Sequence, residues 1–352
     1  MHPECAPSTA REIDLSDRLA RLLAERPYLV ADGAMGTNLF LRGLETGDAP
    51  ELWNVDHPDR VADVHRGFVA AGSDIVLTNT FGANRHRLKL HKLEGRVHEL
   101  NRAAAALART VADSAGRVVV VAGSIGPTGE LLQPLGALTF DEAREAFAEQ
   151  AEGLAEGGAD VLWIETMSAA NEVEAAVAGA ATTGLPNVTT LTIDTNGRTM
   201  MGVTPAEAAA LVHRLLPRPL AFGSNCGTGP AELVASILGL AKASVAGTDV
   251  LVAKGNCGIP QFEDGKIKFS GTPELMAEYA RLARDAGARI IGACCGSEPR
   301  HLKAIVAALK DYTPGPPPDL ATVEARLGAL TQSTKGDAPA VLEEPRRRRR
   351  RG

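Results

Sequence analysis

One pattern repeats along most of this chain: a short apolar stretch, then loop residues, then an amphipathic stretch of helical length. The apolar stretch is rich in Val, Ile and Leu, and it returns about every 25 to 45 residues. It occurs eight times, at residues 28–33, 73–80, 117–126, 159–166, 187–194, 219–226, 248–258 and 288–296. Strands with so few polar residues are typical of a parallel sheet buried on both faces. The pattern therefore predicts an α/β chain folded as a single (β/α)8 TIM barrel, with a doubly wound open sheet as the alternative.

The barrel is expected to occupy residues 16–312, with short flexible extensions at both ends. Residues 1–15 precede the repeating pattern, and we expect them to be flexible. Residues 313–352 begin with the Pro-rich linker PGPPPD, continue through a helix-like stretch and end in the arginine run Arg346–Arg351, so we expect a linker and a disordered tail. A long insertion after the first strand, residues 34–55, is expected to cover the mouth of the barrel.

Composition limits the cellular setting and the class of ligand. Five cysteines, an odd number without regular spacing, fit a reducing compartment. The sequence has neither a signal-peptide pattern nor an apolar run of about 18 residues, so we expect a cytoplasmic protein that does not span a membrane. The net charge is −6 despite the terminal arginine run, which argues against nucleic acid as the main ligand. The oligomeric state, monomer or homo-oligomer, stays open.

Two adjacent cysteines end the last strand-like stretch, ARIIGACCG. Neighbouring thiols are poorly placed to form a disulfide with each other, and they suit a soft metal ion such as Zn²⁺. Cys226 ends another apolar stretch, and the C-terminal ends of barrel strands meet on one rim. Cys226, Cys294 and Cys295 therefore predict a site for one Zn²⁺ per chain, with a fourth position open. We expect Cys257, at a further strand end, to serve packing.

Other polar residues also fall at predicted strand ends. Asp32 and Glu165 are carboxylates that we expect to hold the ammonium group of an amino-acid substrate. The glycine-rich segment GSIGPTG, which includes Gly123 and Ser124, offers backbone N–H groups to a carboxylate. We also expect Asn225, which precedes the first cysteine ligand, to bind the substrate. Trp163 shares side-chain parity with Glu165, and we expect it to pack inside the barrel. Three thiolates make zinc electron-rich, which favours binding a fourth thiol as a sulfur nucleophile over activating water.

At this point the sequence resembles the zinc-dependent homocysteine S-methyltransferases. The matching segments are DGAMGTNL, AGSDIVLTNTFGAN, GSIGPTG, the Glu of WIET, NCG at 225–227 and GACCG at 292–296. They occur in the family's order over about residues 28–310. The resemblance implies a (β/α)8 fold, zinc held by Cys226, Cys294 and Cys295, and transfer of a methyl group to the zinc-bound thiolate of homocysteine, giving methionine. It also implies that Asp32 and Glu165 contact the homocysteine amino group.

The methyl donor is a separate prediction. The segment TGDAPELWNVDHPDRVADVHRGF looks most like bacterial betaine-homocysteine methyltransferases, so we expect glycine betaine as donor and dimethylglycine as second product. A quaternary ammonium group is attracted to aromatic faces, and Trp53 and Phe81 are the candidate contacts. The alternatives are S-methylmethionine as donor, or a role as the homocysteine-binding subunit of a split methionine synthase that works with a separate cobalamin protein.

Overall fold

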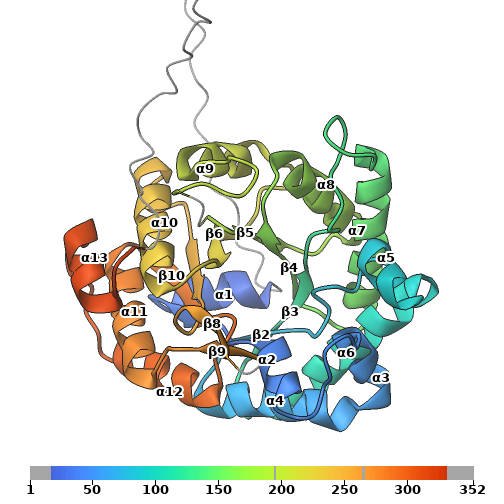
Figure 1. Ribbon diagram of the computed structural model, residues 1–352, viewed down its shortest axis with the longest axis horizontal. Helices are drawn as coiled ribbons and strands as arrows, with labels where there is room; N and C mark the ends of the chain where they lie inside the picture. The colour runs from blue at the N-terminus through green and yellow to red at the C-terminus, as the bar shows by residue number, and fades with distance from the viewer. Residues whose placement is uncertain (1–16, 194–195, 264–265, 331–352) are drawn as a thin grey trace, which may run out of the picture.

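The computed structural model describes residues 17–193, 196–263 and 266–330. Eight parallel strands form a ring around the centre of the molecule, and helices surround the ring (Figure 1). The strand order is β1-β10-β7-β6-β5-β4-β3-β2, and a parallel bridge between Ala31 and Ile75 joins the two ends of this order. The predicted (β/α)8 barrel is confirmed, and the open sheet is excluded.

All eight predicted strands are present at the expected places. The barrel strands are β1 (Leu29–Val30), β2 (Ile75–Leu77), β3 (Val120–Ile125), β4 (Val161–Met167), β5 (Asn187–Leu191), β6 (Ala221–Cys226), β7 (Leu251–Gly255) and β10 (Ala288–Ala293). Two further strands, β8 (Pro260–Glu263) and β9 (Lys266–Phe269), form an antiparallel hairpin between β7 and the next helix. The sequence pattern did not predict this hairpin.

The described helices follow the strands in alternation. They are α1 (Arg18–Glu25), α2 (Met35–Phe40), α3 (Trp53–Asp56), α4 (Pro58–Ala71), α5 (Arg85–Leu88), α6 (Val97–Asp113), α7 (Phe140–Glu156), α8 (Ala170–Ala180), α9 (Pro205–Arg214), α10 (Pro230–Ala243), α11 (Pro273–Asp285), α12 (Pro299–Leu309) and α13 (Leu320–Leu327). Thr204 and Thr272 cap α9 and α11 with their hydroxyl oxygens, each followed by a proline with a preset helical φ. None of these helices is long and apolar enough to cross a membrane.

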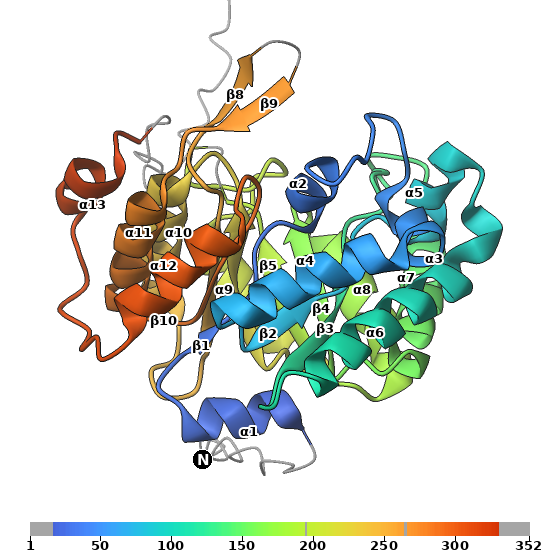
Figure 2. The same cartoon turned by 90° about the horizontal axis from the view of Figure 1, so that it is seen from below.

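The interior of the barrel is a packed apolar core that is closed at one end by α1. Leu19, Leu22 and Leu23 of α1 join the inward side chains of the strands in one buried cluster, which includes Trp163 as predicted. Figure 2 shows α1 beneath the N-terminal ends of the strands, while α2 and the β8–β9 hairpin stand at the opposite end. Arg18 contributes an ion pair of 3.0 Å with Asp160 that ties α1 to the start of β4.

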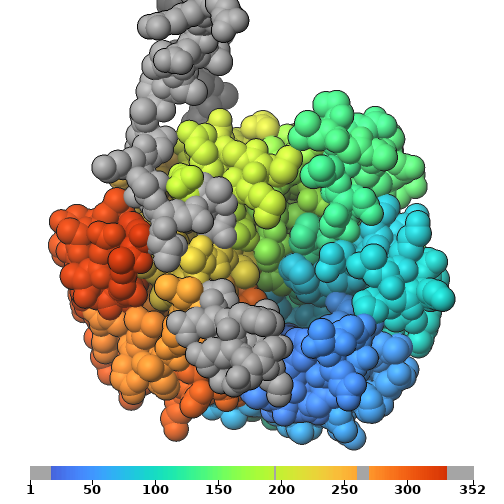
Figure 3. Space-filling view, in the orientation of Figure 1, coloured from blue at the N-terminus to red at the C-terminus, as the bar shows by residue number. Residues whose placement is uncertain are grey.

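The C-terminal ends of the strands open onto the other face of the molecule. Figure 3, viewed onto this face, shows a surface hollowed toward its centre between the blue residues of the first loop and the green and yellow residues opposite. The insertion after β1 contributes α2 and α3 to this rim, as its length predicted. Tyr279 of α11 supports the rim from outside, because its hydroxyl accepts from the Gly255 N–H (3.0 Å) and donates to the Gly292 carbonyl (3.2 Å).

The chain continues past the barrel into α13. Val323 and Leu327 of this helix are buried in the same core that lies between the strands and the surrounding helices. Residues 1–15, predicted to be flexible, lie outside the described residues, as does the part of the predicted 313–352 extension from residue 331 onward, so Cys5 and the arginine run are not described.

Candidate metal centre

Three cysteine thiols from two strand ends meet at the mouth of the barrel. Cys226 ends β6, whereas Cys294 and Cys295 follow β10. Their Sγ atoms all lie within 4.8 Å of one another, and those of Cys226 and Cys295 are 3.9 Å apart. Two thiolates bound to a tetrahedral zinc at about 2.3 Å would be about 3.8 Å apart. The spacing and the sulfur-only donor set therefore fit a soft tetrahedral metal ion with one position left for another ligand.

The backbone at the strand ends holds these thiols in place. Cys226 has φ +64°, a left-handed conformation that side chains rarely adopt and that is often found at functional sites. The Cys294 N–H donates to the Gly255 carbonyl of β7 (2.7 Å), and the Cys257 N–H donates to the Cys295 carbonyl (2.8 Å). Hydrogen bonds from the neighbouring strand end thus fix the cysteine pair before any ligand binds.

The protonation of the three thiols is shared. Hydrogen bonds from Cys294 and Cys295 lower the pKa of Cys226 to about 3, and the same contacts raise the pKa values of the two donors. One thiolate stabilised by two thiols is an arrangement in which a cation can replace the shared protons. Cys257 differs: it is buried outside this cluster, and burial raises the pKa of its thiol to about 12, which fits the predicted packing role.

Three buried charged groups lie in the same mouth. Asp32 accepts from the Leu77 N–H (2.7 Å) and from the Lys254 ammonium (3.0 Å), and both members of this ion pair are almost fully buried. Burial alone would lower the pKa of Lys254, but Asp32 and Glu165 raise it above its ordinary value. Burial raises the pKa of Glu165 to about 7, although Lys254 opposes the shift. The sequence analysis did not predict Lys254. Alternation along the strand puts Lys254 on the same face as Val250 and Val252, which point into the barrel, and this pattern could have identified it as an inward-facing lysine.

The other predicted substrate contacts divide into inward and outward positions. Ser124 faces the mouth and donates to Glu165 Oε1 (2.5 Å). Gly123 lies in β3, where an added Cβ would be 2.9 Å from Leu154 of α7, so its side-chain position faces away from the mouth. Asn225 is fully buried and accepts from the Thr166 N–H (2.9 Å), which connects the ends of β6 and β4.

The two aromatic candidates for the donor lie in different environments. Phe81 follows β2 and is 40% exposed, and its carbonyl accepts from the Gly126 N–H (3.1 Å). Trp53 is only 6% exposed, and the Arg60 guanidinium lies over its ring at 5.0 Å. Trp53 therefore anchors the first loop to the core, and Phe81 is the aromatic side chain of the two that a ligand can reach.

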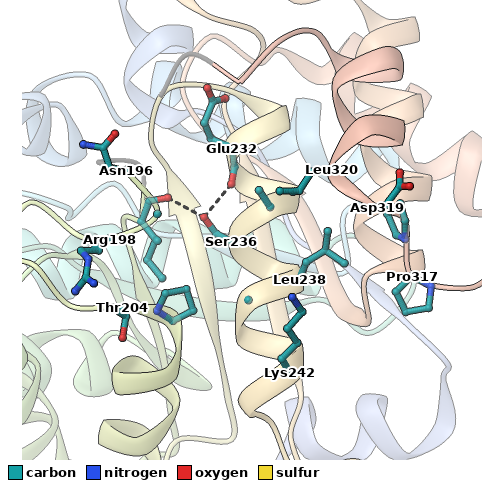
Figure 4. A pocket seen from close by; sticks show the side chains of 16 residues that line it. Asn196, Arg198, Thr204, Glu232, Ser236, Leu238, Lys242, Pro317, Asp319 and Leu320 are labelled. Atoms are coloured by element: carbon teal, nitrogen blue, oxygen red, sulfur yellow. Dashed lines mark hydrogen bonds between the residues drawn. The ribbon is translucent and has the colours of Figure 1, made fainter. Parts of the chain in front are cut away.

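A second cavity lies outside the barrel. It has a volume of about 450 Å³ and lies beside α9 and α10, with residues 317–320 forming part of its wall (Figure 4). Ser236 donates to the carbonyls of Ile193 and Glu232 at this place. The cavity shares no lining residue with the three-cysteine cluster, so the chemistry of the mouth does not extend into it.

Known proteins resemble this chain over the whole barrel. The sequence model of the family described as homocysteine S-methyltransferase matches residues 29–309. The chain belongs to this family. The family match includes every barrel strand and all three clustered cysteines.

Methyltransferases are also among the similar curated proteins and solved structures. Methionine synthases from Mycobacterium leprae and Mycobacterium tuberculosis are each 32% identical, over 85% and 86% of this chain. The match covers only 26% of either synthase, so the chain spans about a quarter of their length. The metallated form of the Escherichia coli homocysteine methyltransferase MmuM is 26% identical with a TM-score of 0.69, covering 82% of this chain and 99% of that one. A Methanosarcina mazei methyltransferase, 15% identical with a TM-score of 0.53 and covering 84% and 98%, shares the fold.

Proposed function

We propose that this protein is a zinc-dependent homocysteine S-methyltransferase that forms methionine. The observation that carries the proposal is the cluster of Cys226, Cys294 and Cys295, whose sulfur spacing fits a tetrahedral metal with one open position. One Zn²⁺ per chain is the ion that suits this donor set. When bound, it would lower the pKa of a substrate thiol, so that the sulfur reacts as a thiolate near neutral pH.

The charged groups of the mouth suit an amino-acid thiol. Asp32 and Glu165 place negative charge beside the cysteine cluster, where it attracts the ammonium group of homocysteine. Ser124 orients Glu165 through its 2.5 Å hydrogen bond, and Asn225 holds the ends of β4 and β6 together. We retain Gly123 and the residues that follow it as the candidate cradle for the substrate carboxylate, because this segment lines the rim at the end of β3.

Glycine betaine is the methyl donor that we propose. In the transfer, the new sulfur–carbon bond forms as the nitrogen–carbon bond breaks, and the nitrogen keeps the electron pair, which leaves dimethylglycine. The Phe81 ring lies at the rim and is accessible to a quaternary ammonium group. Trp53 would contribute by holding the first loop over the mouth, because its ring face is already covered by Arg60.

A second candidate function has its own support. Eight exposed apolar side chains lie on the segments that follow β1, β2, β3, β5 and β7: Phe40, Leu41, Phe81, Leu131, Leu135, Met200, Met201 and Ile259. Apolar side chains exposed around a mouth favour a protein partner. Together with the relation to part of the methionine synthases, they favour a homocysteine-binding subunit that receives its methyl group from a separate cobalamin protein.

One assay separates these functions. The purified, reduced and zinc-loaded chain is incubated with homocysteine and with betaine, S-methylmethionine or methylcobalamin as sole donor, and methionine is measured. Turnover with betaine supports the first proposal, and turnover with methylcobalamin alone supports the second. Absence of methionine with every donor, while the chain binds zinc and homocysteine, would refute the protein as a methyltransferase acting alone.

A further inference from the structure

Strand β4 contains one extra residue close to its C-terminal end. In the ladder with β5, three residue steps of β4, from Ile164 to Met167, correspond to two steps of β5. Ile164 and Met167 both pack in the core between the strands and the helices, although regular alternation puts residues three apart on opposite faces. Thr166, which lies between them, has φ +64°. Such a bulge re-aims the side chain beside it, and here that side chain is Glu165.

A bulge leaves backbone groups without a partner in the ladder, and Asn225 of β6 supplies one. The Thr166 N–H donates to Asn225 Oδ1 (2.9 Å), and Asn225 Nδ2 donates back to the Thr166 hydroxyl (2.8 Å). The Thr190 hydroxyl donates to the same Oδ1 (2.7 Å), so both lone-pair positions of that oxygen are filled inside the protein. Because β5 lies between β4 and β6, the Asn225 side chain bridges two strands that are not neighbours.

The two ends of this bridge adjoin two functional groups of the mouth. Thr166 directly follows Glu165, and Asn225 directly precedes Cys226. Cys226 also has φ +64°, so there is a left-handed residue at each end of the bridge. Such conformations cost free energy and persist only where the surrounding contacts fix them. The reciprocal hydrogen bonds between Thr166 and Asn225 are contacts of this kind.

We propose that Asn225 is a positioning residue: through the Thr166 bulge it sets the direction of Glu165, and it fixes this carboxylate relative to Cys226. Asn225 acts without touching the substrate, since its Oδ1 is already filled and its side chain is buried. The inference rests on the proposed function, because the ligand at which Glu165 is aimed is the amino-acid thiol of that proposal. It goes further by assigning the spacing between the cysteine cluster and the carboxylate to one amide side chain.

The first experiment measures exchange of the Thr166 amide proton with solvent by NMR, without metal or substrate. Asn225→Leu removes the acceptor with little change in shape, so this amide should exchange roughly tenfold faster, the equivalent of one hydrogen bond. The amide of Leu162, in the regular part of β4, should keep its wild-type rate. Thr189→Val, which removes another buried hydroxyl of β5, is the matched control and should leave the Thr166 rate unchanged. Unchanged protection of Thr166 in Asn225→Leu would overturn the inference.

The second experiment compares two thiols on the zinc-loaded proteins by calorimetry: L-homocysteine, and 4-mercaptobutanoate, which is the same thiol without the ammonium group. Thr166→Val keeps the backbone bond and removes the hydroxyl that accepts from Asn225, so it serves even if Asn225→Leu does not fold. A misdirected Glu165 affects only a ligand with an ammonium group, so homocysteine should lose roughly tenfold more affinity than 4-mercaptobutanoate. Thr166→Ser keeps the hydroxyl and should restore the wild-type ratio of the two affinities.

A double variant separates positioning from direct contact. If Asn225 works through Thr166, adding Thr166→Val to Asn225→Leu should not change the affinity ratio further. Losses that multiply in the double variant would show that Asn225 acts on the substrate itself and would overturn the inference. Equal losses for both thiols in Thr166→Val would also overturn it, since a general loss of structure weakens both. If the wild-type protein binds zinc but neither thiol, the proposed function fails and the role assigned to Glu165 fails with it, while the exchange experiment still decides whether Asn225 holds the bulge.

Discussion

Replacing Cys226 by two different small residues tests the metal site and its backbone strain in one series. Cys226→Ala and Cys226→Gly both remove a sulfur from the cluster. Structural zinc sites bind Zn²⁺ with a total free energy of about 10 to 16 kcal/mol, which is roughly 3 kcal/mol for each of four ligands. Loss of one thiolate should therefore weaken zinc binding by more than about 100-fold. Cys257→Ala is the matched control, because its buried sulfur lies outside the cluster and should not alter zinc affinity.

The two variants should differ in stability when no metal is present. At φ +64°, a residue with a Cβ is strained by roughly 1 to 2 kcal/mol, which glycine avoids. Glycine is more flexible in the unfolded chain, which offsets this by roughly 0.4 to 1 kcal/mol. We therefore expect metal-free Cys226→Gly to be more stable than metal-free Cys226→Ala by about 1 kcal/mol, or about 2 °C in the unfolding midpoint.

Chelator competition, elemental analysis and thermal unfolding of the reduced proteins provide the readouts. Full zinc stoichiometry and unchanged affinity in Cys226→Ala would refute the site as described. A metal-free glycine variant that unfolds below the alanine variant would refute the strain argument while leaving the metal site intact.

Three further predictions follow from other parts of the structure. Burial raises the pKa of Glu165 to about 7, so between about pH 4.5 and pH 7 this carboxyl is protonated in the folded metal-free protein and ionised in the unfolded chain. The free energy of unfolding should therefore fall as the pH rises through this range. Urea unfolding curves of Glu165→Gln should show a weaker pH dependence. Gly223→Ala should unfold or precipitate the protein, since the new Cβ would lie 1.9 Å from a carbonyl of β7, whereas Gly95→Ala, with open space around it, should stay soluble and keep the wild-type midpoint. Tyr279→Phe leaves backbone groups of β7 and β10 unpaired and should lower the free energy of unfolding by about 2 kcal/mol in denaturant titrations; no change would show that these groups find other partners.

The sequence predicted the barrel because its strands are nearly continuous apolar runs. This signal is local and can be recognised without knowing which strands pair with each other. The sequence also predicted that Cys226 and Cys294 lie at the same rim, because parallel strands in a barrel end on one face. The position of α1 under the barrel was not predictable in this way, since an amphipathic helix shows which face it buries but not what covers that face. Lys254 was missed for a related reason: its counter-ion, Asp32, is 222 positions away in the chain.

The helix that closes the barrel from below has a kinetic consequence. Because α1 seals the N-terminal end of the described barrel, the mouth is both entrance and exit, and the buried side chains of Asp32, Glu165 and Lys254 are less exposed than the half-buried thiols at the strand ends. In the reaction that we propose, the amino-acid thiol binds at the buried charges and the donor binds above it. The thiol must then enter first, and the spent donor must leave before the methylated thiol can follow. Initial-rate studies should therefore show an ordered sequential mechanism, with the amino-acid thiol first to bind and the thioether last to leave.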